Sequence, residues 1–169
     1  MEAGLSDITV DVCYSEQGQR VLLCGEDVSD EIRTMEVSMA ASVTSAIPAV
    51  RAFLFDLQLS LAEHNNVVMD GRDIGTNVLP HAQVKIFLTA SAEERARRRY
   101  EELRQKGDCQ TYEKVLADVK QRDEQDENRA IAPLRQAEDA VRLDTTELDF
   151  EESAAALLAL VREKLHKGE

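Results

Sequence analysis

The sequence lacks the features that mark membrane-spanning and secreted proteins. No apolar run approaches the 18 or more residues of a membrane-spanning helix, and the first seven residues show neither the basic nor the apolar region of a signal peptide. Cysteine is scarce, and three residues without a CxxC spacing (Cys13, Cys24 and Cys109) argue against a disulfide framework or a zinc site. We therefore expect a cytoplasmic protein with reduced thiols.

Positive charge is also scarce. The chain of 169 residues has 20 Lys and Arg against 33 Asp and Glu, a formal net charge of −13. Residues 1–70 contain no lysine and only three arginines against 12 acidic residues. Binding to duplex nucleic acid or anionic lipid needs clustered Lys and Arg, so we expect neither as a partner. A small anionic ligand stays compatible, because arginines cluster in residues 95–99 and around Arg122 and Arg129.

Hydrophobic periodicity predicts two regions with different secondary structure, which meet near Val67. Residues 7–14 and 20–24 alternate at period two, which predicts a β-hairpin with one polar face. Helices are expected over residues 35–46 and from Pro48 onward, because proline suits the first turn of a helix. From Val67 onward short apolar strands alternate with helices, the pattern of parallel strands covered by helices. The strands are expected at 67–70, 84–88 and 140–143, and the helices at 92–106, 112–126 and 150–166.

Two of these helices are expected to start at capping boxes, in which a Ser or Asp is followed three residues later by Glu. The boxes are Ser91–Glu94 and Asp149–Glu152, and the first helix should end at Gly107.

A first candidate site is Asp70-Gly71-Arg72-Asp73, directly after a predicted strand. Ligands of open α/β sheets bind at the carboxyl ends of the strands. Asp70 is placed like the metal-side acid of a nucleotide-binding protein, and the planar guanidinium of Arg72 matches a phosphate or a carboxylate. Asp73 could accept a hydrogen bond from a ligand amine. The alternative is a polar turn with an internal Arg–Asp pair.

A second candidate is the arginine stripe, defined as Arg95, Arg98 and Arg99, which share one face of the predicted helix. Three like charges on one face cost free energy unless an anion or carboxylates neutralise them. One interpretation is a mobile arginine lid that supplies positive charge to transferring phosphates. The other is a solvated basic stripe, partly neutralised by Glu94, Glu101 and Glu102.

A third candidate follows from the spacing of Arg122, Asp126 and Arg129. This spacing can hold a carboxylate for sugar hydroxyls between two guanidiniums, although ordinary helix salt bridges of a few tenths of a kcal/mol would look the same. A weaker pair, Ser42 and Arg51, lies on two successive helices, so both could face one pocket.

Together these segments closely resemble bacterial cytidylate kinase of the long type, with an enlarged insert that binds the nucleoside monophosphate. The resemblance covers nearly the whole chain and implies an α/β fold, a P-loop kinase-type parallel sheet with flanking helices and a small β-hairpin and helical insert. Residues 1–66 would form the insert and the following helix, and residues 67–169 the remaining core, with a lid at about 92–129. The segments that carry the resemblance are 25–34, 45–51, 70–76, 85–91, 93–99, 128–134 and 144–146.

The resemblance implies phosphoryl transfer from ATP, with Mg²⁺, to CMP or dCMP by a monomer whose partners are small nucleotides. Matching positions assign Ser42, Arg51 and Asp73 to the cytosine, Arg122 and Asp126 to the pentose, and Arg72 and Arg129 to the monophosphate. The catalytic candidates are the lid residues Arg98, Arg95 and Arg99, with Arg98 the first choice, together with Asp70; no direct metal ligand is assigned.

One departure from the family is large. The family begins with a strand and a Gly-rich P-loop ending in Gly-Lys-[Ser/Thr], which cradles the ATP phosphates. Here Gly4, Gly18 and Gly25 are isolated, and no Gly-Lys pair precedes position 71. We therefore expect the P-loop strand to be missing and the strands at 67–70 and 84–88 to have unpaired inner edges.

Three interpretations of the chain follow. The first is an N-terminally incomplete cytidylate kinase, which alone would be inactive and poorly soluble or molten. The second is a short protein that binds nucleoside monophosphate without catalysis, and the third is an unrelated α/β interaction domain.

Overall fold

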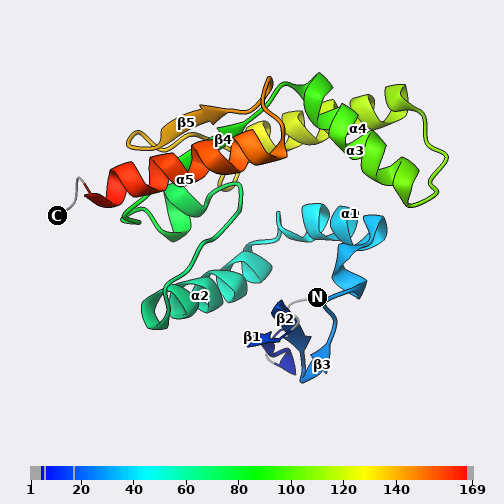
Figure 1. Ribbon diagram of the computed structural model, residues 1–169. Coiled ribbons are helices and arrows are strands. Elements are labelled where there is room, and N and C mark those ends of the chain that lie inside the picture. Colours follow the sequence, from blue (N-terminus) through cyan, green and yellow to red (C-terminus); the bar gives the residue numbers. More distant parts are fainter. Residues whose placement is uncertain (1–4, 6, 17, 167–169) are drawn as a thin grey trace. The chain divides into compact units, whose positions relative to one another are not determined.

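The computed structural model describes residue 5, residues 7–16 and residues 18–166, and it leaves out the side chains of residues 15, 35, 38, 39 and 42. The chain divides into two compact units, Met1–Val68 and Met69–Glu169 (Figure 1). None of the described helices is both long enough and apolar enough to span a membrane. The assignment of residues 1–66 to an insert and of residues 92–129 to a lid stays a prediction.

The first unit begins with a small antiparallel sheet in the order β1-β2-β3. Its strands are β1 (Val10–Ser15), β2 (Gly18–Leu23) and β3 (Glu26–Asp27). The predicted hairpin is confirmed, with Val10 opposite Leu23. Gly25 connects β2 to β3 with φ of +85°, a conformation that glycine adopts without the clash of a Cβ atom.

Helices fill the rest of the first unit. A short 3₁₀ turn, Glu31–Arg33, precedes α1 (Met35–Thr44) and α2 (Pro48–His64). The hydroxyl of Thr34 caps α1 by accepting a hydrogen bond from the backbone N–H of Val37. Pro48 opens α2 and Ile47 before it is extended, as the sequence predicts.

The second unit contains a two-stranded parallel sheet and three helices. Strands β4 (Ile86–Thr89) and β5 (Val141–Asp144) pair from Ile86 opposite Val141 to Thr89 opposite Asp144. The helices are α3 (Ala92–Gln105), α4 (Tyr112–Asn128) and α5 (Phe150–His166). The prediction of a mixed α/β architecture with a parallel sheet is confirmed. The absence of a central P-loop strand stays a prediction.

The strand predicted at residues 67–70 is wrong. Residues 65–73 adopt no strand conformation, and the side chain of Val68 is fully exposed, with a relative accessibility of 101%. A strand is stabilised by hydrogen bonds to a neighbouring strand, and β4 and β5 pair only with each other within the described chain. Residues 67–70 are mostly apolar and long enough for a strand, but the described chain has no neighbouring strand available to pair with them.

One of the two predicted capping boxes forms completely and the other forms only in part. At the start of α5 the box is complete, because the Asp149 N–H donates to Glu152 Oε2 at 3.0 Å and the Glu152 N–H donates to Asp149 Oδ1 at 2.8 Å. At the start of α3 only half of it forms. Ser91 Oγ accepts from the Glu94 N–H at 3.2 Å, but the Ser91 N–H donates to Thr146 Oγ1 at 2.9 Å. The Glu94 carboxylate is therefore available to other partners.

The apolar core is sparse. In the described part of the chain no large side chain is completely buried, whereas Leu88 of β4 and Phe150 of α5 are 59% and 82% exposed. The best-packed group joins α3 to α4 through Ala96, Leu103 and Val115. The buried apolar residues are Val78, Ala90, Ala96, Leu103 and Val115.

We expect the 169-residue polypeptide to unfold over a broad range of urea concentration and to bind the dye ANS, because exposed apolar surface and loose packing produce both effects. The slope of the free energy of unfolding against urea should be low, since it scales with the surface exposed on unfolding. Circular dichroism and ANS fluorescence across a urea series measure these quantities. A steep, single transition of a monomer without ANS binding would contradict the expectation.

Candidate functional site

Four charged side chains from two separate segments meet in the second unit. Arg72 Nε donates to Asp126 Oδ2 at 2.8 Å, although the two residues are 54 positions apart. One terminal nitrogen of Arg129 lies 3.9 Å from Asp126 Oδ1, and the other lies 3.9 Å from Asp73 Oδ1. The structure thus brings together members of the first and third candidate sites. We call Arg72, Asp73, Asp126 and Arg129 the four-charge cluster.

The four-charge cluster is largely withdrawn from water. Asp73 and Asp126 are 8% and 7% exposed. The Arg129 side chain is 15% exposed, whereas that of Arg72 is 41% exposed. Buried carboxylates are costly unless they are paired and hydrogen-bonded, and two arginines here balance two aspartates. A neutral cluster can accept an anion only where an arginine donor stays free.

Local structure holds each aspartate. Asp126 lies in the last turn of α4, where its side chain is buried. Asp73 precedes a single π-helical turn, Ile74–Val78, and its carbonyl accepts from the Asn77 N–H at 2.8 Å. Asn77 Nδ2 also donates to Asp73 Oδ2 at 3.3 Å. Such π-helical turns are frequent at functional sites. Asn77 was not predicted, because nothing in its sequence position marks it as a partner of Asp73.

Arg129 has a terminal nitrogen without a hydrogen-bond partner, which lies 3.9 Å from Asp73 Oδ1. Its Nε donates to the carbonyl of Ala132 at 2.6 Å. One terminal nitrogen, Nη2, is buried and makes no hydrogen bond within the described residues. A buried donor left unsatisfied costs about 1–3 kcal/mol. The oxygen of an anionic ligand would remove this cost, and this makes Arg129 the strongest anion-binding candidate in the cluster.

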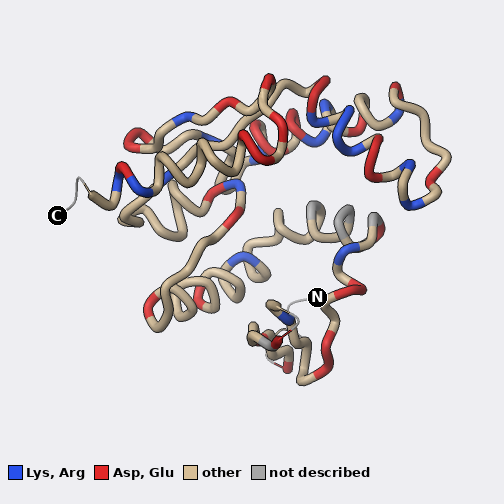
Figure 2. The backbone as a smooth tube through the Cα atoms, viewed as in Figure 1, with Lys and Arg blue, Asp and Glu red and all other residues tan. Residues whose placement is uncertain are grey.

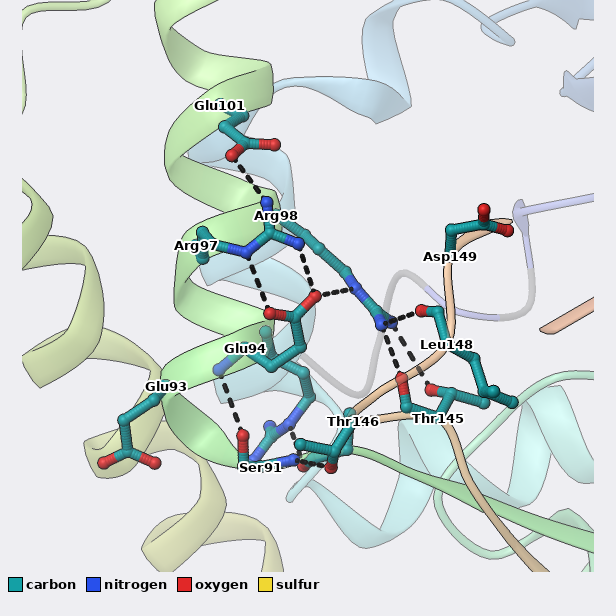
Figure 3. Close-up of polar contacts among 12 residues, drawn as sticks. Ser91, Glu93, Glu94, Arg97, Arg98, Glu101, Thr145, Thr146, Leu148 and Asp149 are labelled. Atoms are coloured by element: carbon teal, nitrogen blue, oxygen red, sulfur yellow. Dashed lines mark hydrogen bonds and ion pairs between the residues drawn. The ribbon is translucent and has the colours of Figure 1, made fainter. Parts of the chain in front are cut away.

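The arginine-rich helix α3 forms a separate network at the carboxyl end of the sheet (Figure 3). Arg98 Nε donates to Glu94 at 2.7 Å, and its Nη2 donates to the carbonyls of Thr145 and Leu148 at 2.6 and 3.0 Å. The guanidinium of Arg98 therefore ties α3 to the segment that follows β5. Arg97 binds Glu94 as well, and its other terminal nitrogen binds Glu101 at 2.7 Å.

The other two members of the arginine stripe have different partners. Arg95 makes a two-point contact with Asp123 of α4 at 2.8 and 2.7 Å, and Arg99 donates to Glu102 at 3.2 Å. The stripe is therefore neutralised by carboxylates and backbone carbonyls, as in the solvated-stripe interpretation. Figure 2 shows Lys and Arg alternating with Asp and Glu along α3 and α4. The lid role of the stripe stays a prediction.

Glu94 is the most strongly perturbed acid of this network. The hydrogen bond from Arg97, followed by that from Arg98, lowers the pKa of Glu94 from 4.5 to about 2. A carboxylate whose pKa is depressed in the folded state stabilises the fold above its unfolded pKa, and this stabilisation is lost as the pH falls through the folded pKa. The contribution of Glu94 is therefore expected to disappear between about pH 4.5 and about pH 2.

We expect E94Q to melt below the wild type at pH 7, because the substitution removes the charge that pairs with Arg97 and Arg98. The difference in melting midpoint should shrink as the pH falls from 4.5 to about 2, where the wild-type carboxylate takes up a proton. Thermal melts of both proteins across this range measure the effect. E101Q, which removes one exposed contact of Arg97, is the matched control with a smaller shift. A difference independent of pH would contradict the assignment.

The remaining predicted residues lie outside both networks. Asp70 and Arg122 are exposed, and neither makes a side-chain hydrogen bond or an ion pair within the described chain. The predicted placement of Asp126 between Arg122 and Arg129 is wrong, because Arg72 takes the place of Arg122. The cause is that Arg122 faces solvent one turn before Asp126.

Two predicted residues belong to the first unit. Arg51, in α2, is half-buried and donates to the carbonyl of Ser45 at 3.5 Å. Ser42 is part of α1, and its side chain lies outside the described atoms. Their predicted contacts with a base stay predictions.

No group of three or more His, Cys, Asp and Glu side chains that could hold a metal ion occurs among the described residues. Asp70, the predicted metal-side acid, is thus a single exposed carboxylate.

Comparisons with known proteins agree with each other. The family model described as cytidylate kinase matches residues 2–163. The cytidylate kinase of Carboxydothermus hydrogenoformans is 50% identical over 160 residues, which cover 95% of this chain and 72% of that protein. The enzyme of the same name from Caldanaerobacter subterraneus subsp. tengcongensis is 53% identical and is aligned over 97% of this chain and 70% of its own length. That from Geobacter sp. (strain M21) is 47% identical, with 99% and 74% aligned.

Proposed function

The chain belongs to the cytidylate kinase family, a family of phosphotransferases, and from this premise we propose that its four-charge cluster binds CMP or dCMP. The family excludes the third interpretation, an unrelated α/β interaction domain. The observation that carries the proposal is the buried terminal nitrogen of Arg129 that has no hydrogen-bond partner. A phosphate oxygen is the acceptor that best suits such a donor.

The monophosphate would be held between Arg129 and Arg72. Arg72 uses Nε to bind Asp126 and its side chain is 41% exposed, so its terminal nitrogens would donate to the phosphate. Two guanidiniums around one phosphate neutralise its charge and orient it. Phosphoryl transfer depends on such positioning and on positive charge rather than on covalent chemistry by the protein.

The pentose and the base would contact the two aspartates. Asp126 Oδ2 is occupied by Arg72, whereas Oδ1 lies 3.9 Å from Arg129 and has room to accept from a sugar hydroxyl. Asp73, held by Asn77, would accept from the exocyclic amino group of cytosine. Arg122 would add a further contact to the pentose on the strength of the family match alone, and the roles of Ser42 and Arg51 of the first unit stay predictions from the family resemblance.

The chain has few residues that could bind ATP, the phosphate donor. ATP is the phosphate donor of cytidylate kinases, yet the 169 residues contain no Gly-Lys-[Ser/Thr] segment to cradle its phosphates. Mg²⁺ in kinases is held by one or two carboxylates together with the substrate phosphates, and Asp70 is the acid that we propose on this side of the site. The residues present do not fit ATP by themselves. We therefore propose that this polypeptide binds the acceptor nucleotide and does not transfer phosphate alone.

The arginine stripe would need to exchange partners in order to act as a lid. Arg98 is held by Glu94 and by two backbone carbonyls, so a phosphate would have to compete with all three acceptors. Arg95 is held as fully, because Asp123 accepts from both of its terminal nitrogens and the Ala90 carbonyl accepts from its Nε at 3.0 Å. Closure of the lid would therefore require Arg95 and Arg98 alike to release protein acceptors, and Arg98 stays the first choice among the phosphate ligands.

The base contact is tested by D73N. Because Asn presents both a donor and an acceptor, D73N should weaken CMP binding by about 1.5–3 kcal/mol, the range for a hydrogen bond to a charged group, and should reduce the preference for CMP over UMP. Titration calorimetry with both nucleotides measures this preference. D118N, which changes an exposed acid of α4 that pairs with Lys114, is the control for binding. Equal loss of CMP and UMP affinity in D73N would contradict the base contact.

A further inference from the structure

Ala132 has an unusual backbone conformation. Its φ is +49°, and Cys24, with φ of +51°, is the other non-glycine residue of the described chain with a positive value. The left-handed region is unfavourable for residues with a Cβ atom. Pro133 follows, and a residue before proline is also disfavoured in the right-handed helical region. Strained conformations of this kind persist where surrounding contacts determine them, and they cluster at functional sites.

The strained residue contacts the four-charge cluster directly. The Ala132 carbonyl accepts from Arg129 Nε at 2.6 Å. Two residues further on, the Leu134 N–H donates to the carbonyl of Asp126 at 2.8 Å, which closes the loop onto the end of α4. The loop 129–134 therefore starts and ends at the cluster, and the backbone carbonyl of Ala132 is the hydrogen-bond acceptor that the described residues offer to Arg129 Nε.

This contact determines which nitrogens of Arg129 stay available. A guanidinium donates through Nε on one edge and through its terminal nitrogens on the others. With Nε bound to Ala132, the terminal nitrogens lie 3.9 Å from Asp126 and from Asp73, and one of them is unsatisfied. The backbone at Ala132 thus fixes the orientation in which Arg129 holds the terminal nitrogen that lacks a hydrogen bond.

The second left-handed residue has a different environment. The Cys24 N–H donates to the carbonyl of Thr9 at 2.8 Å, which continues the pairing of the hairpin beyond β2. Cys24 follows the end of that strand and is exposed. It offers the same backbone geometry in a purely structural setting.

We propose that Ala132 is a positioning residue for Arg129: its left-handed backbone turns the carbonyl onto Nε and leaves the terminal nitrogens for the monophosphate of the ligand. The inference rests on the proposed role of Arg129 in binding that phosphate.

The test compares side chains of similar size and opposite backbone preference. Asn tolerates the left-handed region, whereas β-branched Val does not. We expect A132V to raise the Kd for CMP about tenfold, equivalent to about 1.4 kcal/mol, and to leave the Kd for cytidine, which has no phosphate, within about twofold. A132N should bind both ligands about as the wild type does. C24N and C24V are the matched controls, and neither should change the ratio of the two Kd values.

A double-mutant cycle provides a readout that needs no ligand. Urea midpoints are measured for A132V alone, for R129Q alone and for both together, with C24V in place of A132V as the control. A132V should lower the urea midpoint more when Arg129 is present than in the R129Q background. Only with Arg129 present does the substitution leave a buried donor, Arg129 Nε, without its acceptor. The shift caused by C24V should be the same in both backgrounds.

The outcomes separate the two proposals. Equal shifts of A132V in the two backgrounds, or equal effects of A132N and A132V on CMP affinity, would overturn the positioning role of Ala132. A wild-type chain that does not bind CMP, combined with a clear coupling between Ala132 and Arg129, would overturn the proposed function and leave the positioning role standing.

Discussion

Replacing Asp126 by alanine is expected to lower the free energy of unfolding by about 3 kcal/mol, the lower end of the cost of breaking a buried ion pair by removing one partner. Asp126 is 7% exposed and accepts from Arg72 at 2.8 Å. Its removal leaves the Arg129 side chain, 15% exposed, with fewer negative neighbours. Domains have total stabilities of about 5–15 kcal/mol, and the sparse core places this chain at the lower end. D126A should therefore keep about 2 kcal/mol of stability and melt well below the wild type.

Urea unfolding followed by circular dichroism measures the loss. D118A is the matched control, because Asp118 lies on the same helix and pairs with Lys114 at 2.6 Å on an exposed surface. Exposed pairs contribute about 0–1 kcal/mol, so D118A should unfold close to the wild type. D126N, which keeps the shape of the side chain, should fall between the two. A loss in D126A no larger than that in D118A would show that the four-charge cluster does not hold the site together.

The second large effect is the absence of catalysis. With CMP, ATP and Mg²⁺ the 169-residue polypeptide should form ADP at the rate of a blank without protein. The reason is that a P-loop supplies backbone amides and a lysine to the donor phosphates, and the loss of even one such donor at a transition state costs a factor of about 10²–10³. A coupled assay of ADP formation measures the rate.

The cytidylate kinase of Carboxydothermus hydrogenoformans, which is 50% identical to this chain, is the positive control. ADP formation that depends on CMP, increases in proportion to the concentration of the chain and disappears in R129Q would contradict the prediction. Such a result would mean that other residues of this chain hold the donor.

Local signals predicted most helix boundaries. Pro48 at the start of α2, the Asp149–Glu152 box at the start of α5 and Gly107 after α3 each act within a few residues, so a sequence shows them. The strand expected at residues 67–70 fails for the opposite reason. A strand depends on a neighbour distant in the sequence, and an apolar tripeptide cannot show whether that neighbour is available.

The sequence singled out the four residues of the four-charge cluster, but it did not predict which of them contact each other. The spacing of Asp126 and Arg129 on one helix indicated a paired carboxylate, yet the strongest partner of Asp126 is Arg72, from another segment. Likewise the helical spacing of Arg95 did not indicate that Asp123 of α4 would bind its guanidinium. Helical periodicity reports which residues share a face, and it does not report which partners the fold brings to that face.

Two residues of the site carry no signal in the sequence. Asn77 acts through a π-helical turn, and Ala132 acts through its backbone carbonyl. A backbone contact of this kind depends on φ and ψ rather than on the side chain. Neither position would be selected by a search for residues with catalytic chemistry.

The central claim is that the four-charge cluster binds a nucleoside monophosphate through Arg129. The most direct measurement is titration calorimetry of CMP and of cytidine into the wild-type chain and into R129Q, without ATP. The wild type should bind CMP more tightly than cytidine, and R129Q should lose about 1.5–3 kcal/mol of CMP affinity, the value of a charge-assisted hydrogen bond, with cytidine unchanged. Equal affinities of the wild type for CMP and cytidine, or a CMP affinity that R129Q leaves unchanged, would contradict the account.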